Sequence, residues 1–142
     1  YSTAGNLLEA IGPEAWMSYG EAAVAGQPGG DAMRITLGPG ASLYQCVAYT
    51  LLRRLRAVGR LKLWSDMPVE VGIAVEVGAP DREDARDGVM RWHSLSETPQ
   101  WYRVTHTFDD SPPGLCLRIQ APEDSGISLY LIDASLGHVV EE

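Results

Sequence analysis

The sequence predicts an all-β protein, an antiparallel β-sandwich. Apolar and polar residues alternate in one segment after another, and turn-forming clusters such as QPGGD, GPG and DDSPPG separate these segments. Alternation with a period of two is typical of a strand with one buried face, and short strands at regular spacing are typical of a sandwich or barrel. Convincing helical stretches are scarce.

The clearest predicted strand is VEVGIAVEV at 69–77. Its inward series is wholly β-branched, which suits a pleated sheet, and its outward series carries Glu70 and Glu76 with Gly72 and Ala74 between them. A dry face and a wet face are what an antiparallel sandwich requires. The nine predicted strands are 15–19, 22–26, 32–37, 42–49, 59–66, 69–77, 100–108, 114–122 and 128–136.

Two segments break the alternation. TLLRRLRAVG at 50–59 is expected to form about two turns of helix or a basic loop, and 78–99 is too long for a tight turn. Long loops in compact domains are often functional or mobile. The 142 residues suffice for one core, so 1–142 is expected to be a single domain. Because the chain starts with Tyr1, we expect a module excised from a longer protein.

The formal net charge of −8 opposes general binding to nucleic acid or anionic lipid, since both require a cationic surface. No apolar run approaches the roughly 18 residues of a membrane span, so no membrane insertion is expected. The segment 53–62 nevertheless carries five of the 11 basic residues. Such a local patch could meet an acidic polymer or an acidic subunit, or could neutralise nearby carboxylates.

The two cysteines, Cys46 and Cys116, are too far apart in the chain to form a zinc-binding motif. Both lie in predicted strands. A disulfide is feasible if those strands are neighbours, and two buried free thiols are the other interpretation.

Trp64 is the main candidate for ligand contact. In GRLKLWSD at 59–66, alternation buries Leu61 and Leu63 and turns Lys62, Trp64 and Asp66 outward. An outward indole either packs under a loop or a neighbouring domain, or meets a flat apolar partner such as a sugar ring, with polar groups binding its hydroxyls.

A hairpin through SDMP at 65–68 is expected to place Gly72 and Ala74 beside Trp64, because small neighbours leave an indole uncovered. On this interpretation Glu70 and Glu76 share the outward face with Lys62 and Asp66 and bind hydroxyl groups.

Further candidates lie elsewhere in the chain. Trp92 falls in the long predicted loop, where an aromatic side chain could form an edge site. Arg103 is outward on the strand at 100–108. Tyr44 and Gln45 alternate, so one of them is expected on the wet side beside the strand of Trp64.

Catalysis is not expected. The three histidines are scattered, and the sequence contains neither G-x-S-x-G nor H-E-x-x-H. The chain is therefore predicted to be a non-enzymatic accessory domain.

The order of several motifs resembles the galactose-binding-like jelly-roll family, the fold of many carbohydrate-binding modules. The resemblance covers Asn6 to about Leu136. Its motifs are Asn6-Leu7-Leu8, the early Trp16, the strands AMRIT and LYQCV, the aromatic in KLWSD, the Trp-led QWYRVTHTF, and LYLIDASL.

This resemblance implies a non-catalytic module that attaches a parent protein to a polysaccharide outside the cell, at a cell surface or on a particle. Its partners would be a glycan and the parent protein's other domains. The LLRRLRAVG segment departs from the family's short polar loop and favours an acidic glycan. No cofactor is required, but the resemblance implies a structural calcium ion between Glu14 and Asp133, since hard cations prefer oxygen ligands.

The alternative is a structural or attachment domain, in which the same sandwich mediates protein–protein assembly in a multidomain enzyme or a phage-like fibre or spike. Trp64 and the basic segment would then form an interface. The predicted ligand-binding residues are Trp64, Lys62, Asp66, Glu70, Tyr44, Gln45, Trp92 and Arg103, and the predicted metal ligands are Glu14 and Asp133.

Overall fold

The period-two alternation of the sequence appears as strands throughout the computed structural model, which describes residues 2–3, 16–26, 32–48, 55–77, 87–108 and 114–140. These residues contain no helix long and apolar enough to cross a membrane. The strands are β1 (Ser2–Thr3), β2 (Met17–Tyr19), β3 (Ala22–Gly26), β4 (Met33–Leu37), β5 (Ser42–Ala48), β6 (Leu55–Trp64), β7 (Val69–Val77), β8 (Asp87–Leu95), β9 (Gln100–Phe108), β10 (Gly114–Gln120) and β11 (Ile127–Val140).

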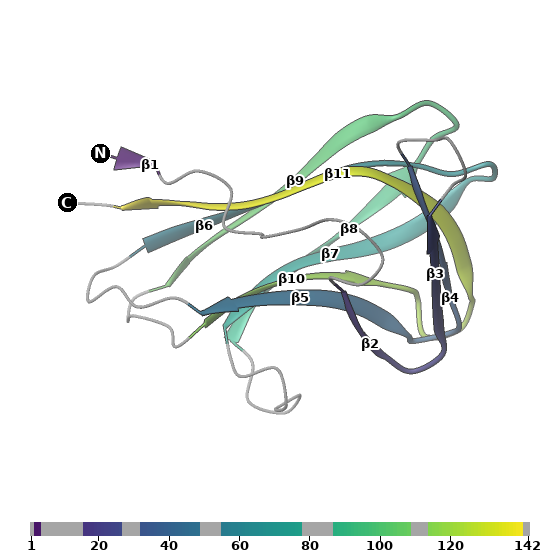
Figure 1. Cartoon of the computed structure of the whole chain (residues 1–142), viewed down its shortest axis with the longest axis horizontal. Coiled ribbons are helices and arrows are strands. Elements are labelled where there is room, and N and C mark those ends of the chain that lie inside the picture. Colours follow the sequence, from purple (N-terminus) through teal and green to yellow (C-terminus); the bar gives the residue numbers. More distant parts are fainter. Residues whose placement is uncertain are drawn as a thin grey trace.

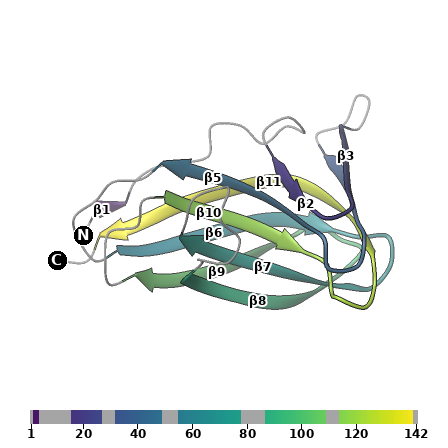
Figure 2. The ribbon, with the colours of Figure 1, turned by 90° about the horizontal axis from the view of Figure 1, so that it is seen from below.

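Two antiparallel sheets pack face to face, as predicted (Figure 1). Sheet A has the strand order β3-β4-β11-β6-β9, with β1 paired to β11, and sheet B has the order β2-β5-β10-β7-β8. Seen from below, β5, β10, β7 and β8 of sheet B run side by side across the molecule (Figure 2). The all-β sandwich and its jelly-roll character are therefore confirmed.

The core lies between the sheets and is built from the predicted inward series. Val71, Ile73 and Val75 of β7 face Leu61 and Leu63 of β6, and none of these side chains is exposed to solvent. Burying such side chains contributes roughly 1.5–3 kcal/mol each, so this layer is the main source of stability.

The prediction for 50–59 is wrong from residue 55 onward, because β6 begins at Leu55. Ala57 and Gly59 continue the inward series of Leu61, and both are buried. Alanine and glycine carry little hydrophobic signal, so the alternation was not recognisable there. Residues 49–54, with Arg53 and Arg54, lie outside the described residues.

The prediction of one long loop at 78–99 is also wrong, because residues 87–95 form β8. β8 is an edge strand of sheet B and pairs only with β7. An edge strand with Arg91, Trp92 and Ser94 exposed has a weak apolar alternation. Trp92 and His93 therefore stand on a strand and not in a loop.

His93 faces the core side of β8, opposite Val71. Its ring meets the ring of Tyr102 edge-on, with centroids 5.3 Å apart. The buried Nε2 atom has no hydrogen-bond partner in the described structure. Desolvation by burial lowers the pKa of His93 below its ordinary value of 6.5.

We therefore expect the free energy of unfolding to fall as the pH drops through 6.5. Between the lowered pKa and 6.5 the unfolded chain binds more protons than the folded chain, so stability rises with pH in that window and is complete above it. Urea unfolding between about pH 5 and 7 should show this slope in the wild type and a smaller one in His93→Phe. Identical slopes would show that His93 does not contribute.

The SDMP segment is not a hairpin within one sheet. It carries the chain from β6 in sheet A to β7 in sheet B. Leu63 and Val71 both point into the core, but from opposite sheets. Alternation predicts which face of a strand is buried, but it does not say to which sheet the strand belongs.

Cys46 and Cys116 form a disulfide, which decides between the two interpretations left open above. They are register partners on β5 and β10, two neighbouring strands of sheet B. The described residues contain no free cysteine.

Candidate functional site

Half of the predicted ligand-binding residues lie on or beside the outer face of sheet A. Trp64 and Lys62 point outward from β6, Arg103 points outward from the neighbouring β9, and Asp66 follows in the turn after β6. The outward orientation predicted for these side chains is confirmed.

Trp64 is half-buried because it stacks on Tyr130 of β11, its register partner. The two ring centroids are 4.1 Å apart and the planes are inclined by 12°. The Tyr130 hydroxyl donates a hydrogen bond of 3.2 Å to Asp66. One face of the indole is therefore covered by the protein itself. Gly72 and Ala74 do not lie beside Trp64, because they belong to sheet B.

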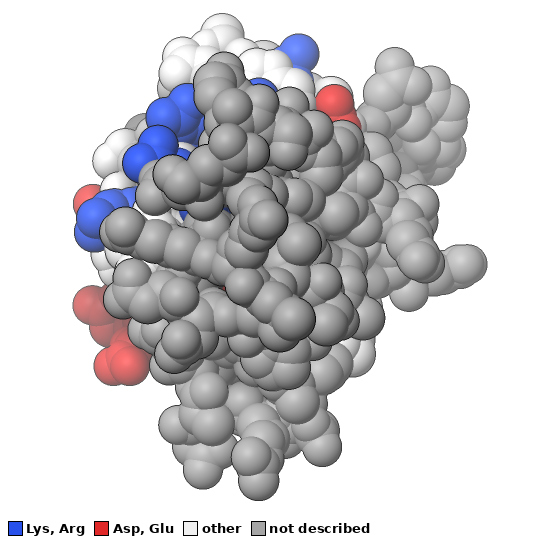
Figure 3. All heavy atoms as spheres, turned by 90° about the vertical axis from the view of Figure 1, so that its left-hand side faces the viewer, with Lys and Arg blue, Asp and Glu red and all other residues white. Residues whose placement is uncertain are grey.

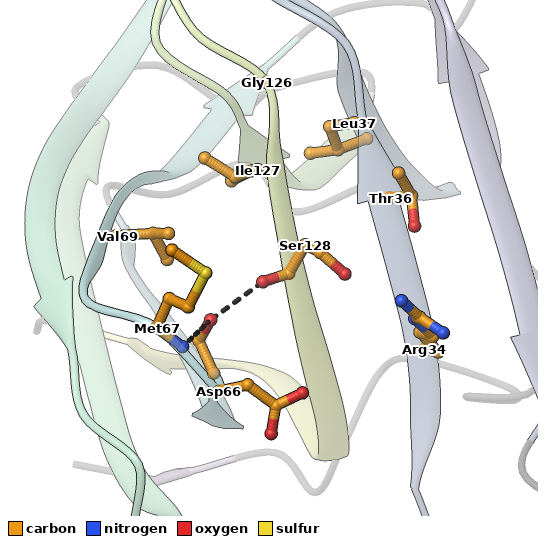
Figure 4. Close-up of a pocket in the computed structure, with 10 residues that line it drawn as sticks. Arg34, Thr36, Leu37, Asp66, Met67, Val69, Gly126, Ile127 and Ser128 are labelled. Carbon is orange, nitrogen blue, oxygen red and sulfur yellow. Dashed lines mark hydrogen bonds between the residues drawn. The ribbon is translucent and has the colours of Figure 1, made fainter.

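A pocket of about 430 Å³ opens at the end of sheet A near this stack (Figure 4). Arg34 and Asp66 stand on opposite sides of it, and Met67 and Val69 belong to its apolar wall. Ser65 links the walls: its hydroxyl donates to the Ser128 carbonyl at 2.8 Å and accepts from the Met67 amide. The pocket thus combines an apolar lining with one cation and one carboxylate.

The other predicted ligand-binding residues belong to sheet B. Tyr44 and Glu70 point outward from β5 and β7, and Trp92 points outward from β8. Gln45 points inward, because it lies two residues from the core residue Leu43 on the same face of β5. One of the pair is therefore outward, as predicted, but not beside the strand of Trp64, since β5 and β6 are in different sheets. Glu70 and Glu76 likewise lie across the sandwich from Lys62 and Asp66.

The small residues predicted to accompany Trp64 accompany Trp92. Gly72 and Trp92 are register partners on β7 and β8. A Cβ atom added at Gly72 would lie 3.3 Å from Cη2 of the Trp92 ring and 2.8 Å from Sδ of Met90. Both side chains therefore lean over the glycine, and Ala74 beside it has no exposed surface. The outer face of β7 is consequently not wet at Gly72 and Ala74, contrary to prediction.

Arg118 on β10 is the central polar group of the sheet B face, and only 4% of it is exposed. Its Nε donates to Glu76 at 3.3 Å, its Nη1 donates to the Ser42 hydroxyl, and its guanidinium lies 4.9 Å from the centre of the Tyr44 ring. A buried cation is tolerated only when it is paired and hydrogen-bonded. These contacts hold Tyr44 and Glu76 in fixed positions on the face.

Two exposed aromatic rings flank this polar centre. One register row across all five strands of sheet B reads Tyr19, Ser42, Gln120, Gly72 and Trp92. Tyr19 is 53% exposed and Trp92 is 49% exposed. With strands spaced about 4.8 Å apart, four inter-strand steps separate their backbones by about 19 Å. Small and polar residues fill the row between the two rings.

Sequence reasoning missed Arg118, Tyr19 and Tyr130. Arg118 interrupts the apolar strand GLCLRIQ at an outward position, which was a readable signal for a buried ion pair. Tyr19 is exposed on β2, a strand of three residues that is too short for alternation to indicate its outward face. Trp101 is exposed on β9, at the outward position that alternation predicts.

The predicted calcium site stays a prediction. Asp133 is exposed on β11 beside an irregularity in the strand register, and its Oδ1 accepts a hydrogen bond of 2.9 Å from the Ala134 amide. Glu14 lies outside the described residues. Within those residues, no group of three or more histidine, cysteine, aspartate or glutamate side chains could hold a metal ion.

No protein-family model and no curated protein sequence matches the chain. Solved structures do match. A structure titled "CBM4 structure and function" is 12% identical, covers 94% of this chain and 97% of its own, and has a TM-score of 0.64. The CBM22-1 xylan-binding domain of Paenibacillus barcinonensis Xyn10C is 14% identical, with coverage of 98% and 95% and a TM-score of 0.61.

The enzymatically active domain of the bacteriophage CBA120 tailspike protein 4 is also similar, at 9% identity and a TM-score of 0.63. The match covers 88% of this chain but only 19% of the tailspike chain. At such identities the comparisons establish the fold: the chain is a β-sandwich of the jelly-roll type that these carbohydrate-binding modules share.

Proposed function

We propose that the domain is a non-catalytic carbohydrate-binding module that holds a glycan on the sheet B face, with Trp92 as its principal contact. The observation that carries this proposal is the register row from Tyr19 to Trp92, in which two exposed rings flank small and polar residues. Recognition of a sugar requires flat aromatic surfaces for its C–H faces and fixed polar groups for its hydroxyls.

The charges of this face favour a neutral polysaccharide. Arg118 and Glu76 form an ion pair and so cancel each other, which leaves the exposed Glu70 as a negative charge on this face that disfavours an anionic polymer. The side chains of Glu70 and Gln120 carry oxygen and amide groups that suit the uncharged hydroxyl groups of a sugar. The similar solved structures are mostly carbohydrate-binding modules, which supports glycan binding as the role of this fold here.

The spacing of the carboxylates supports a non-catalytic role. Glu70 and Glu76 both point outward from β7, but six residues along one strand separate their backbones by about 20 Å. Glycoside hydrolysis usually requires two carboxyl groups roughly 5–9.5 Å apart. This pair therefore does not fit that arrangement.

The disulfide supports a location outside the cell or on a surface. Bonds such as Cys46–Cys116 persist mainly in oxidising environments. A module that attaches a larger protein to a polysaccharide would work in such a place.

The proposal is tested by electrophoresis in gels loaded with neutral polysaccharides, such as xylan, hydroxyethylcellulose and galactomannan. The wild type should be retarded by at least one of them. Trp92→Ala should bind that polymer roughly thirtyfold more weakly, because loss of a central aromatic contact typically costs about 2 kcal/mol.

Trp101→Ala is the matched control. Trp101 is as exposed as Trp92, at 51% against 49%, but it stands on sheet A. If a neutral polymer retards Trp92→Ala as strongly as the wild type but does not retard Trp101→Ala or Trp64→Ala, the binding site lies on sheet A. No retardation of the wild type by any polymer would remove the proposal.

A further inference from the structure

The outer face of sheet A carries two arginines directly opposite each other. Arg60 on β6 and Arg103 on β9 are register partners, and both are exposed. Side chains in this relation start from Cβ atoms about 4.5–5.5 Å apart, and like charges placed so destabilise a sheet. A fold that keeps such a pair benefits when an anion lies between the two side chains.

These cations form no ion pair within the described residues. Arg60 and Arg103 form no ion pair in the described structure, and neither do Arg34 and Lys62 on the same face. Asp133 is the register partner of Lys62, but one of its oxygens accepts the Ala134 amide.

The face is therefore cationic on a strongly acidic chain. Among the described residues, four cations point outward from β4, β6 and β9, against the two carboxylates Asp66 and Asp133, which leaves a surplus of two positive charges (4 − 2 = 2). The whole chain has a net charge of −8. Figure 3 shows lysine and arginine atoms gathered toward the upper side, where Figure 1 places sheet A, with the larger acidic group below them. The four cations are Arg34, Arg60, Lys62 and Arg103.

Flat aromatic surface lies among the cations. Trp101 is 51% exposed and is the register partner of Lys62. Trp64 lies two residues beyond Lys62 on β6 and is therefore the diagonal neighbour of Trp101. Trp64 stacks on Tyr130, and Tyr130 is the register partner of Arg34 on β4. Arg34 in turn stands at the pocket near the end of the sheet (Figure 4). The cations thus lie beside two aromatic groups, Trp101 and the Trp64–Tyr130 stack.

The spacing of the cations suits a polymer with one charge per ring. Along β6, the backbones of Lys62 and Arg60 are about 7 Å apart, because two residue steps of about 3.3 Å each separate them. DNA carries one negative charge about every 1.7 Å along its axis. A polymer of this charge density would be repelled strongly by a chain with a net charge of −8. An acidic polysaccharide offers both ring faces for stacking and well-separated anions for bidentate contact with arginine.

We infer that the sheet A face is a second binding surface, which takes an anionic polysaccharide, carboxylated or sulfated. Sugar rings stack on Trp101, and their acid groups lie between Arg60 and Arg103 and against Lys62. This surface is separate from the sheet B face and does not depend on it.

The test is electrophoresis in gels that contain polygalacturonate, its fully methyl-esterified form, or dextran sulfate. Polygalacturonate or dextran sulfate should retard the wild type, and the two arms distinguish a carboxylate from a sulfate preference. The methyl ester has the same backbone without charge, so it should not bind this face and should retard the protein less than polygalacturonate does. Raising the salt to about 0.5 M should weaken the interaction strongly, because screening is short-ranged there.

The double variant Arg60→Gln/Arg103→Gln and the single variant Trp101→Ala should each bind at least tenfold more weakly. Trp92→Ala should bind the anionic polymer as the wild type does. Without polymer, Arg103→Gln should unfold at a higher temperature than the wild type, because it removes the like-charge pair. Weaker binding together with higher stability separates the loss of a site from a loss of folding.

Three results would overturn the inference. The first is retardation by neither anionic polymer, or retardation that the double variant leaves unchanged. The second is equal retardation of the wild type by single-stranded DNA, which would indicate unspecific attraction of polyanions. The third is a dimer in sedimentation experiments that the double variant abolishes, which would assign the face to a second copy of the chain.

Discussion

Replacing Gly59 with valine is expected to lower the free energy of unfolding by about 3 kcal/mol, at the upper end of the usual cost of overpacking. Gly59 lies in the middle of β6 and faces the core. A Cβ atom there would lie 2.6 Å from Cδ1 of Leu117 and 2.9 Å from Cγ1 of Val75, two side chains of the opposite sheet. The two sheets approach closely here because this position has no side chain.

The result is informative because local preference predicts the opposite sign. Glycine weakens the interior of a strand and valine favours it, by up to about 1 kcal/mol. Only the packing against sheet B makes the substitution harmful. The urea midpoint should fall by roughly 1–2 M for a typical dependence on denaturant.

Ala23→Val serves as the control, since Ala23 is exposed on β3 and gains the same two methyl groups at no cost in packing. We expect a change within about 0.5 kcal/mol there. Gly59→Ala should fall between the wild type and Gly59→Val. An unchanged midpoint for Gly59→Val would mean that the sheets can separate locally without cost.

Reduction of the Cys46–Cys116 bond is expected to lower the free energy of unfolding by roughly 2–4 kcal/mol. The bond joins residues 70 positions apart, so the unfolded chain loses much conformational freedom when it is closed. Cys116 is buried, so reduction should be slow under native conditions.

The measurement compares urea midpoints with and without a reducing agent for the wild type and for the double variant Cys46→Ala/Cys116→Ala. The double variant should resemble the reduced wild type and should not respond to the reductant. If the oxidised and reduced wild types unfold at the same midpoint, the disulfide does not stabilise the domain.

The predicted strands illustrate what can be read locally. VEVGIAVEV and QWYRVTHTF form strands with the predicted bounds. The first has a wholly β-branched inward series, and the second alternates strictly between an inward series led by Tyr102 and Val104 and an outward series that includes Arg103. β8 was missed because Arg91 and His93 stand at its inward register positions, opposite Ile73 and Val71, so the apolar alternation is interrupted. The start of β6 was missed because Ala57 and Gly59 occupy its inward positions.

The candidate sites illustrate what cannot be read locally. The idea that small residues uncover a tryptophan on this fold was correct for Gly72, but the tryptophan concerned is Trp92 and not Trp64. Nothing between Leu63 and Val71 in the sequence indicates that the chain changes sheets at SDMP. Trp64 instead stacks on Tyr130, whose position 66 residues later in the chain gives no local signal.

The sequence by itself determined that the chain is all-β, which side chains of most strands face the core, and that Trp64, Lys62 and Arg103 point outward. These follow from the period-two geometry of a strand, which depends on neighbouring residues alone. Only the tertiary structure decided which strands share a sheet, that Cys46 bonds to Cys116, and that the aromatic and charged residues divide into a face around the Arg118–Glu76 ion pair and a cationic face around Arg60. Those relations depend on pairing between distant segments, which is set by the packing of the whole sandwich.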